Sequence, residues 1–269
     1  MAALRSALAL VVGLLAYPGL AAAAGCFPVA STPSPLLHLA NLGLPRVSAA
    51  IPAGATVQLT FLGHSSFLIE TARGVTAVTD YNAYVRAPTA PDIVTMNNAH
   101  DSHYTDFVDP AVKHALRGWN PAGGEAQHDV TLEDLRVRNI PTSVHGRSGS
   151  QGNSNSIFVF EASDLCVAHL GHLHHELTRE HLGELGQIDV LMVPVDGSYT
   201  MAQDQMARVI ETIGAPLVIP MHYFGSSTLA RFLTHVEPTH EVVFAESSTV
   251  ALSRATLPAS PRVLVLPGR

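Results

Sequence analysis

Histidines follow the predicted strands of this chain, and that repeated order restricts its fold more than any other feature. The sequence has 15 histidines and a single lysine, Lys113. Neutral imidazole offers one directed lone pair, which makes histidine the commonest protein ligand of zinc and similar metals. His100, His103, His145, His172 and His222 each lie within a few residues of the end of a predicted strand. Loops at strand ends on rigid sheets can bring distant side chains together, so the pattern predicts a metal site.

Short strand-like runs alternate with helical segments from Thr56 onward. Apolar and β-branched residues predict strands at 57–62, 67–71, 75–79, 93–96, 130–132, 135–139, 157–161, 165–169, 190–193, 217–221, 242–244 and 249–252. Helices are predicted at 109–116, 177–185, 201–213 and 227–236, the first with Asp109 as N-cap and Pro110 in its first turn. The polar segment 148–156 is predicted to be a flexible loop. Two groups of strands with interspersed helices indicate a layered α/β sandwich.

The composition of the chain allows a large hydrophobic core and argues against nucleic acid as a partner. Hydrophobic residues make up 47% of the chain and charged residues only 14%, with a formal net charge of −7. A nucleic-acid-binding protein needs clustered lysine and arginine, so nucleic acid is not expected as a partner. Residues 55–269 have the length of one sizeable domain. The expected partner is a small-molecule substrate, and the oligomeric state is left open.

The N-terminus has the pattern of an export signal. Arg5 precedes an apolar run over residues 7–16, and Ala22-Ala23-Ala24 offers a small-residue cleavage site. We therefore expect a signal peptide at 1–24, a leader at 25–54 and a periplasmic or secreted protein. Ala-Ala-Gly-Cys at 23–26 also resembles a weak lipoprotein box, which would leave the protein anchored through Cys26. No segment is long enough to predict a transmembrane span after cleavage.

The two cysteines, Cys26 and Cys166, give a weaker indication. They could pair in an oxidising compartment. Cys26, however, lies in a proline-rich leader, while Cys166 lies in an apolar run. We therefore interpret Cys166 as a small buried hydrophobic residue rather than half of a disulfide.

Several motifs together resemble one known family. In chain order they are Thr60-Phe61-Leu62-Gly63-His64-Ser65-Ser66-Phe67, Thr79-Asp80, Asn98-Ala-His-Asp-Ser-His103, His145 followed by Gly152-Asn153, His169-Leu-Gly-His172, and Pro194–Met201 leading to Pro220-Met-His-Tyr223. The ordered set is similar to the metallo-β-lactamase-fold metal-dependent hydrolases. Its pattern is most similar to the branch of ascorbate-phosphate lactonases and N-acyl-phosphatidylethanolamine phospholipases D.

This resemblance implies a four-layer αββα sandwich with a metal site at one sheet edge. By position, one metal would be held by the residues that match Asn98, His100 and His145. A second would be held by those that match Ser102, His103 and His222, with His172 in place of the bridging carboxylate. Asp80 matches a residue that braces the ligand loop, and His64 matches a histidine beside the groove.

Three of these positions depart from the family pattern: asparagine replaces histidine at 98, serine replaces aspartate at 102, and histidine replaces aspartate at 172. Two dications about 3.5 Å apart repel strongly, and neutral imidazole cannot bridge them as a carboxylate does. We therefore predict one metal ion, zinc, with manganese or iron as alternatives. His172 could complete a three-histidine set with His100 and His145, or with His103 and His222.

The resemblance implies a hydrolase that uses metal-activated water on an ester, lactone or phosphodiester. Because Ser102 cannot act as a base, proton transfer is assigned to His64, His175 or Asp196. Asp196 could instead only shape a turn. The alternative is a non-catalytic metal- or ligand-binding protein on a degenerate fold, since the usual base and bridge are absent.

Overall fold

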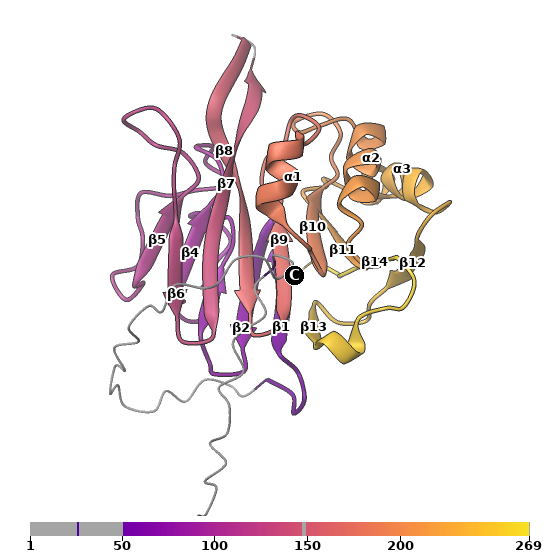
Figure 1. Ribbon diagram of the computed structural model, residues 1–269, viewed down its shortest axis with the longest axis horizontal. Coiled ribbons are helices and arrows are strands. Elements are labelled where there is room, and N and C mark those ends of the chain that lie inside the picture. The colour runs from indigo at the N-terminus through magenta and orange to yellow at the C-terminus, as the bar shows by residue number, and fades with distance from the viewer. Residues whose placement is uncertain (1–25, 27–50, 147–148, 269) are drawn as a thin grey trace, which may run out of the picture.

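Two β-sheets pack face to face in the computed structural model of this protein (Figure 1). The structure describes residues 26, 51–146 and 149–268, without the side chains of 145, 146 and 149–151. The first sheet contains, in spatial order, β13 (Thr249–Leu252), β1 (Val57–Gly63), β2 (Ser66–Thr71), β3 (Thr76–Val78), β4 (Ile93–Met96) and β5 (His114–Arg117).

The second sheet is larger. Its order is β12 (Glu241–Phe244), β14 (Arg262–Val265), β11 (Leu217–Met221), β10 (Val190–Pro194), β9 (Leu165–His169), β8 (Gly149–Ala162), β7 (Leu135–Gly146) and β6 (Asp129–Leu132). β9, β10 and β11 are parallel and buried along their whole length. This explains their continuous apolar sequences, because central parallel strands are covered on both faces.

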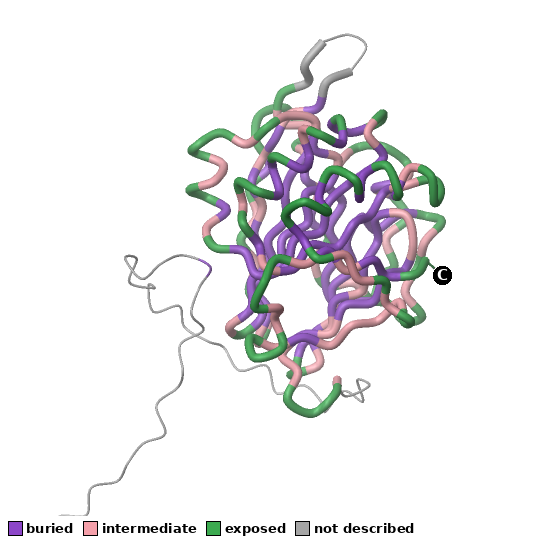
Figure 2. The backbone as a smooth tube through the Cα atoms, turned by 90° about the vertical axis from the view of Figure 1, so that its right-hand side faces the viewer, coloured by how far each residue is buried: buried purple, intermediate pink, exposed green. Residues whose placement is uncertain are grey.

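The main core lies between the sheets. Phe67 and Ile69 of the first sheet belong to the same buried cluster as Phe158, Met192 and Ile219 of the second. Figure 2 shows the buried residues concentrated in this interior and the exposed ones at the periphery. A rigid two-sheet core of this kind fixes the positions of the loops at its edge.

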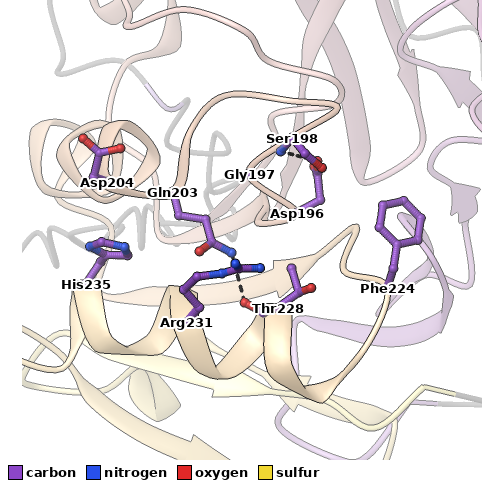
Figure 3. Close-up of a pocket in the computed structure, with 9 residues that line it drawn as sticks. All are labelled: Asp196, Gly197, Ser198, Gln203, Asp204, Phe224, Thr228, Arg231 and His235. Atoms are coloured by element: carbon purple, nitrogen blue, oxygen red, sulfur yellow. Dashed lines mark hydrogen bonds between the residues drawn. The ribbon is translucent and has the colours of Figure 1, made fainter.

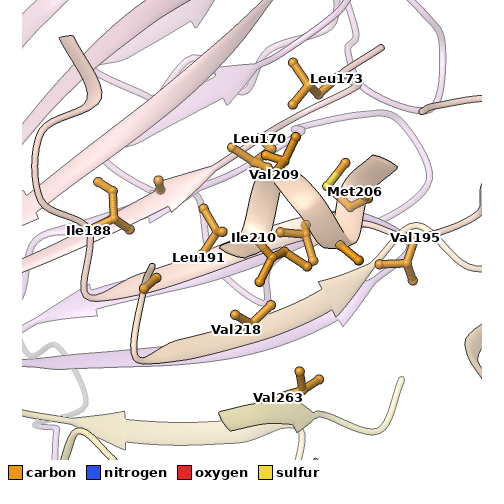
Figure 4. Packing of buried hydrophobic residues seen from close by; sticks show 14 of the residues in the cluster. Leu170, Leu173, Ile188, Leu191, Val195, Met206, Val209, Ile210, Val218 and Val263 are labelled. Carbon is orange, nitrogen blue, oxygen red and sulfur yellow. The ribbon is translucent and has the colours of Figure 1, made fainter. Parts of the chain in front are cut away.

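Helices cover the outer face of the second sheet. They are α1 (Arg179–Leu185), α2 (Gln203–Ile213) and α3 (Ser226–Val236). Met206, Val209 and Ile210 of α2 pack with Leu191 and Val218 of the sheet (Figure 4). No helix of the described residues is long and apolar enough to cross a membrane.

The outer face of the first sheet is covered by loops. Val78 and Val94 pack there against Val85, Val108 and Trp119. The mixed α/β fold with two facing sheets confirms the predicted fold class. The fourth layer, however, is made of loops in the part of the chain that the structure describes.

Three predictions about elements were wrong. The expected helix at 109–116 is instead a loop followed by β5, which pairs in parallel with β4. The capping signals of Asp109 and Pro110 could not make a helix there, because His114–Arg117 completes the sheet edge instead. The polar segment expected as a loop belongs largely to β8, whose pairing with β7 reaches Gly149. β14 was missed; the remaining predicted strands and helices are confirmed with shifted ends.

The interpretation of the cysteines was also wrong. Cys26 and Cys166 form a disulfide, with their Cα atoms 5.7 Å apart. The backbone carbonyl of Cys26 accepts a hydrogen bond of 2.7 Å from the amide of Gln187. Residue 26 is therefore attached to β9 and to the segment after α1. The predicted signal peptide, 1–24, lies outside the described residues. Of the predicted leader, 25–54, only Cys26 and residues 51–54 are described.

Candidate metal centre

The candidate site lies where strands of both sheets end at one edge of the sandwich. Its side chains come from the loops that follow β1, β3, β4, β9, β10 and β11, in the order His64, Asp80, His103, His172, Asp196 and His222. The two sheets are joined directly here, because the amide of His222 donates a hydrogen bond of 2.7 Å to the carbonyl of His64. Of the five strand-end histidines named from the sequence, the structure brings His103, His172 and His222 together here.

His103 and His222 form the centre of the cluster. Their Nε2 atoms lie 3.2 Å apart, and both side chains are buried. Each Nδ1 contacts a carboxylate: His103 contacts Asp80 at 2.7 Å, and His222 contacts Asp196 at 3.0 Å. We assign the ring protons to Nδ1, since a carboxylate accepts hydrogen bonds. Two lone pairs then face each other, an arrangement that a cation between them would stabilise.

The separation of these two nitrogens fits a metal ion. Two ligands of a tetrahedral zinc site, with Zn–N bonds of about 2.0–2.1 Å, have nitrogens roughly 3.3 Å apart. His64 supplies a third nitrogen, and one ring nitrogen from each of the three histidines lies within 4.8 Å of the others. Carboxylates behind histidine ligands orient the rings and make them better donors. The three histidines could therefore hold a metal ion.

Burial keeps the cluster's outer histidines neutral. It lowers the pKa of His64 to about 4, with further contributions from the neighbouring His222 and His103. The same causes, with burial again the largest, lower the pKa of His172 to about 2. Only the neutral form of imidazole binds a metal, so both rings are in the form that a metal centre needs near neutral pH.

The two carboxylates behave differently from the histidines. Burial alone would raise the pKa of Asp80, but the charge of His103 and its hydrogen bond lower it well below its usual range. For Asp196 the opposing effect of burial is outweighed by hydrogen bonds from His222 and Thr200, among others. Both groups are therefore anions. They lie behind the imidazoles rather than between two metal positions.

The backbone is strained where the site is built. His64, Asp80 and His222 have φ angles of 54°, 43° and 55°, in the left-handed region that non-glycine residues avoid. Such conformations cost of order 1–3 kcal/mol each and cluster at functional sites. Glu133, Asn153 and Ser163, outside the cluster, have similar angles, so it is the contacts of His64, Asp80 and His222 that set these three positions apart.

His172 extends the cluster toward solvent. Its ring centroid lies 4.9 Å from that of His103 and 5.3 Å from that of His222. Its Nδ1 is 2.9 Å from Nε2 of His174, a hydrogen bond that fixes the ring. Of the two sets predicted for His172, the structure places it next to His103 and His222.

Other predicted site residues lie farther out. His100 is exposed, with its ring 6.0 Å from that of His103, and its Nδ1 contacts the hydroxyl of Ser102 at 2.9 Å. Asn98 donates its side-chain amide to the carbonyl of Ser154 in β8. His175 accepts a hydrogen bond from the amide of Ser143. The backbone of His145 belongs to β7, but its side chain lies outside the described residues.

Asp196 shapes a turn, which is one of the two roles considered for it. Its carboxylate accepts hydrogen bonds from the amides of Ser198, Tyr199 and Thr200 and from the hydroxyl of Thr200, which shapes a turn. The same carboxylate braces His222. The geometry makes Asp196 a positioning residue, because its oxygens are already occupied by donors.

Sequence reasoning placed His64 beside the site as a proton-transfer residue, whereas the structure groups it with the metal-ligating nitrogens. The strand-end position after Gly63 was the available signal. His169 was quoted in a motif but given no role. It is fully buried, donates through Nε2 to the carbonyl of Ser65, and accepts through Nδ1 from the amide of Gly171. It connects the loops after β1 and β9.

Comparison with known proteins agrees with this geometry. A family model described as "Beta-lactamase superfamily domain" matches residues 58–222, a span that runs from β1 to His222. A UPF0173 metal-dependent hydrolase of Methanoculleus marisnigri is 27% identical over 187 residues, covering 62% of this chain and 81% of the relative. A protein of the same name from Salinibacter ruber is 28% identical over 192 residues, covering 62% and 84%.

Solved structures show the same fold. A protein from Thermotoga maritima, named as a Zn-dependent hydrolase of the metallo-β-lactamase superfamily, is 27% identical. The match has a TM-score of 0.59 and covers 79% of this chain and all of that one. The narrower branch suggested by the motifs stays a prediction. Since the family model matches more than half of the chain, this protein belongs to the β-lactamase superfamily domain family, with the metallo-β-lactamase fold.

Proposed function

We propose that this protein is a metal-dependent hydrolase that uses one ion, held by His64, His103 and His222, to cleave an ester, lactone or phosphodiester. The observation that carries the proposal is the pair of carboxylate-braced histidines whose Nε2 atoms face each other at 3.2 Å. The names of the relatives, which are metal-dependent hydrolases, support it.

The proposal of a single ion rests on where the negative charges lie. Asp80 and Asp196 contact the far nitrogens of the ligand imidazoles, and position 172, where the family has its bridging carboxylate, holds a histidine. Among the described residues, no carboxylate stands between two candidate metal positions. Two adjacent dications need such an anion between them, so one ion fits this chain better than two. Zinc is our first choice, because three imidazoles suit it.

The residues divide the work as follows. Lewis acidity from the ion would activate water near neutral pH and polarise a carbonyl or phosphoryl oxygen. Asp80 and Asp196 hold the Nδ1 protons of His103 and His222, so that the Nε2 lone pairs stay directed at one point. His172, fixed by His174, forms the wall on the solvent side, where a substrate would enter.

Hydrolysis of simple chromogenic substrates tests this proposal. Zinc-loaded protein should turn over 4-nitrophenyl acetate, a thiolactone or bis(4-nitrophenyl) phosphate, and His103→Ala or His222→Ala should abolish turnover. His114→Ala, on β5 away from the cluster, is the control and should keep full activity. Stoichiometric zinc binding with no turnover of any substrate would instead favour the non-catalytic binding protein.

We further propose that the protein is exported, and that Cys26 is disulfide-bonded rather than acylated. The apolar N-terminal segment supports export, and disulfides persist mainly in oxidising compartments. The Cys26 thiol cannot carry a lipid while it is bonded to Cys166. Mass spectrometry of unreduced protein from its own compartment should find a Cys26–Cys166 peptide. An acylated Cys26 would contradict this proposal.

A further inference from the structure

A cavity of about 330 Å³ adjoins the histidine cluster. Its walls come from the loop after β10, from the start of α2 and from α3 (Figure 3). Asp196 and Ser198 line it on one side, Gln203 on another, and Phe224, Thr228 and Arg231 on the third. None of these residues has a role in the proposed function except Asp196.

Two of the lining residues connect the cavity to the metal centre. Asp196 contacts the Nδ1 of His222. The ring of Phe224 lies 5.4 Å from the ring of His222 and 6.0 Å from that of His64. Phe224 therefore lines the cavity and also contacts two histidines of the cluster.

The cavity is lined by two carboxylates, those of Asp196 and Asp204, and by one guanidinium, that of Arg231. Both carboxylates have partners: Asp196 accepts hydrogen bonds from the donors that surround it, and Asp204 forms an ion pair of 3.2 Å with Arg208. Arg231 extends along the cavity from α3, and among the described residues no acidic side chain is paired with it. Its guanidinium is thus an available cation with a planar set of donors, which suits a carboxylate or phosphate.

Phe224 lines the cavity, and Tyr199 packs against it. Phe224 and Tyr199 pack edge to face at 5.6 Å and stay 61% and 66% exposed. Both are held by the same structure that positions His222: the amide of Tyr199 donates to Asp196, and Phe224 is two residues beyond His222. Two rigid, solvent-facing rings beside a polar cluster provide an apolar surface for part of a substrate.

We propose that this cavity binds the anionic group of the substrate, with Arg231 as its counter-ion and Phe224 against the apolar part next to the scissile bond. The substrate class is therefore an ester or phosphodiester that carries a separate carboxylate or phosphate. This inference rests on the proposed function for the reaction, but its binding part can be tested without turnover.

The kinetic test compares a neutral ester with a charged one. Arg231→Gln should lower kcat/KM for the 4-nitrophenyl monoester of succinic acid about 10- to 100-fold, mainly through KM, because a charge-assisted hydrogen bond is lost. Turnover of neutral 4-nitrophenyl acetate should change less than about threefold. Arg179→Gln, an exposed arginine on α1, is the matched control and should change neither. An equal effect of Arg231→Gln on both esters, or no effect, would overturn the proposal.

The binding test is independent of catalysis. Calorimetry on chelator-treated protein should detect phenylphosphonate or benzoate, and Arg231→Gln should abolish the binding while Arg179→Gln retains it. The preferred ligand distinguishes a phosphate from a carboxylate substrate. If binding depends on Arg231 but no ester is hydrolysed, the proposal of an anion-binding cavity is supported and the proposal of hydrolase activity is contradicted. Absence of binding, or binding that Arg231→Gln leaves intact, overturns the cavity proposal.

Discussion

At the scale of single residues, the two buried carboxylates set the properties of the histidine cluster. Asp80 accepts hydrogen bonds from the amide of Asn97 and from His103, so that it holds the backbone of the ligand loop and a ligand ring together. Asp196 does the same for its own turn and His222. The family position of Asp80 had indicated a bracing role, and the contacts show how it braces.

Asp80→Asn should weaken metal binding without removing a ligand. An amide can still occupy the position, but it loses the charge that holds the proton on His103, and loss of such a partner typically costs about 10- to 100-fold in affinity. Competition for zinc with a chromophoric chelator measures the change. Asp92→Asn is the control: Asp92 is also buried, but it contacts Thr76 and Lys113 instead. Unchanged affinity in Asp80→Asn would show that the carboxylate does not support the ligand.

The left-handed backbone at His64 gives a second prediction. Glycine adopts this conformation freely, whereas alanine pays about 1–2 kcal/mol for it. In chelator-treated protein, His64→Gly should therefore be more stable than His64→Ala by about 1 kcal/mol in urea unfolding. Both variants should lose zinc affinity, because both lack the imidazole. Equal stability of the two variants would mean that the position carries no strain.

The chemistry of these residues could be read only partly from the sequence. Histidines after apolar runs, such as His103 and His222, were recognisable because strand ends of one sheet edge meet. The grouping of His64 with them was not, since it depends on a left-handed turn after β1 and on the hydrogen bond between His222 and His64 across the two sheets.

At the scale of elements, close packing between loops holds the site edge together. Gly171, after β9, has φ +60°, and a Cβ there would lie 2.5 Å from the Nδ2 of Asn97 and 2.7 Å from the Oδ1 of Asn155. Asn97 follows β4 and Asn155 belongs to β8, so this contact fixes the loop of His172 relative to the loop of His103. Only glycine fits between them.

Gly171→Ala should therefore destabilise the protein and disturb the cluster. The overpacking and the unfavourable φ together should cost about 1–3 kcal/mol in urea unfolding, and zinc affinity should fall with it. Gly183→Ala in α1 is the matched control, because nothing lies within 4 Å of the added methyl group. It should raise stability by up to about 1 kcal/mol, since alanine favours a helix. If Gly171→Ala is as stable as Gly183→Ala, the packing argument fails.

The prediction of strands succeeded for segments that are buried along their whole length. It failed where pairing at the edge of a sheet, rather than the sequence of the segment, determines the structure. The apolar runs of β9, β10 and β11 are recognisable because both faces of these strands are buried. β5 was mistaken for helix, since four residues at a sheet edge carry little periodicity of their own. The β8 extension is polar, and its pairing with β7 rather than its side chains makes it a strand.

At the scale of the whole molecule, the site depends on two sheets that meet at one edge, and a distant disulfide ties residue 26 to β9. A link between cysteines 140 positions apart leaves no local signal in the sequence. The family resemblance predicted the two-sheet sandwich correctly. It could not predict that loops rather than a helix cover the outer face of the first sheet.

Acidification should destabilise the metal-free protein. His64, His172 and the fully buried His169 have lowered pKa values in the folded state, with burial as the main cause. The unfolded chain therefore binds more protons as pH falls below about 6.5, and stability falls with it. The pKa values of Asp80 and Asp196 are also lowered, but these carboxylates reduce the stability of the folded protein only below about pH 4, where the unfolded chain begins to protonate them.

Urea unfolding in the presence of a chelator measures this effect. The midpoint should decrease between about pH 7.5 and about pH 5. His172→Gln, which removes one of the neutral imidazoles, should show a smaller decrease. A midpoint that is constant or rises toward pH 5 would contradict the assignment of neutral histidines in the folded cluster.

The central claim is that His64, His103 and His222 hold one metal ion, and its most direct test is the zinc content after equilibrium dialysis. We expect one tightly bound zinc ion per chain, lost in His103→Ala and in His222→Ala, weakened in His64→Ala, and retained in the control His114→Ala. Zinc content that is unchanged in His103→Ala and His222→Ala would contradict the claim, as would two tightly bound ions in the unaltered protein.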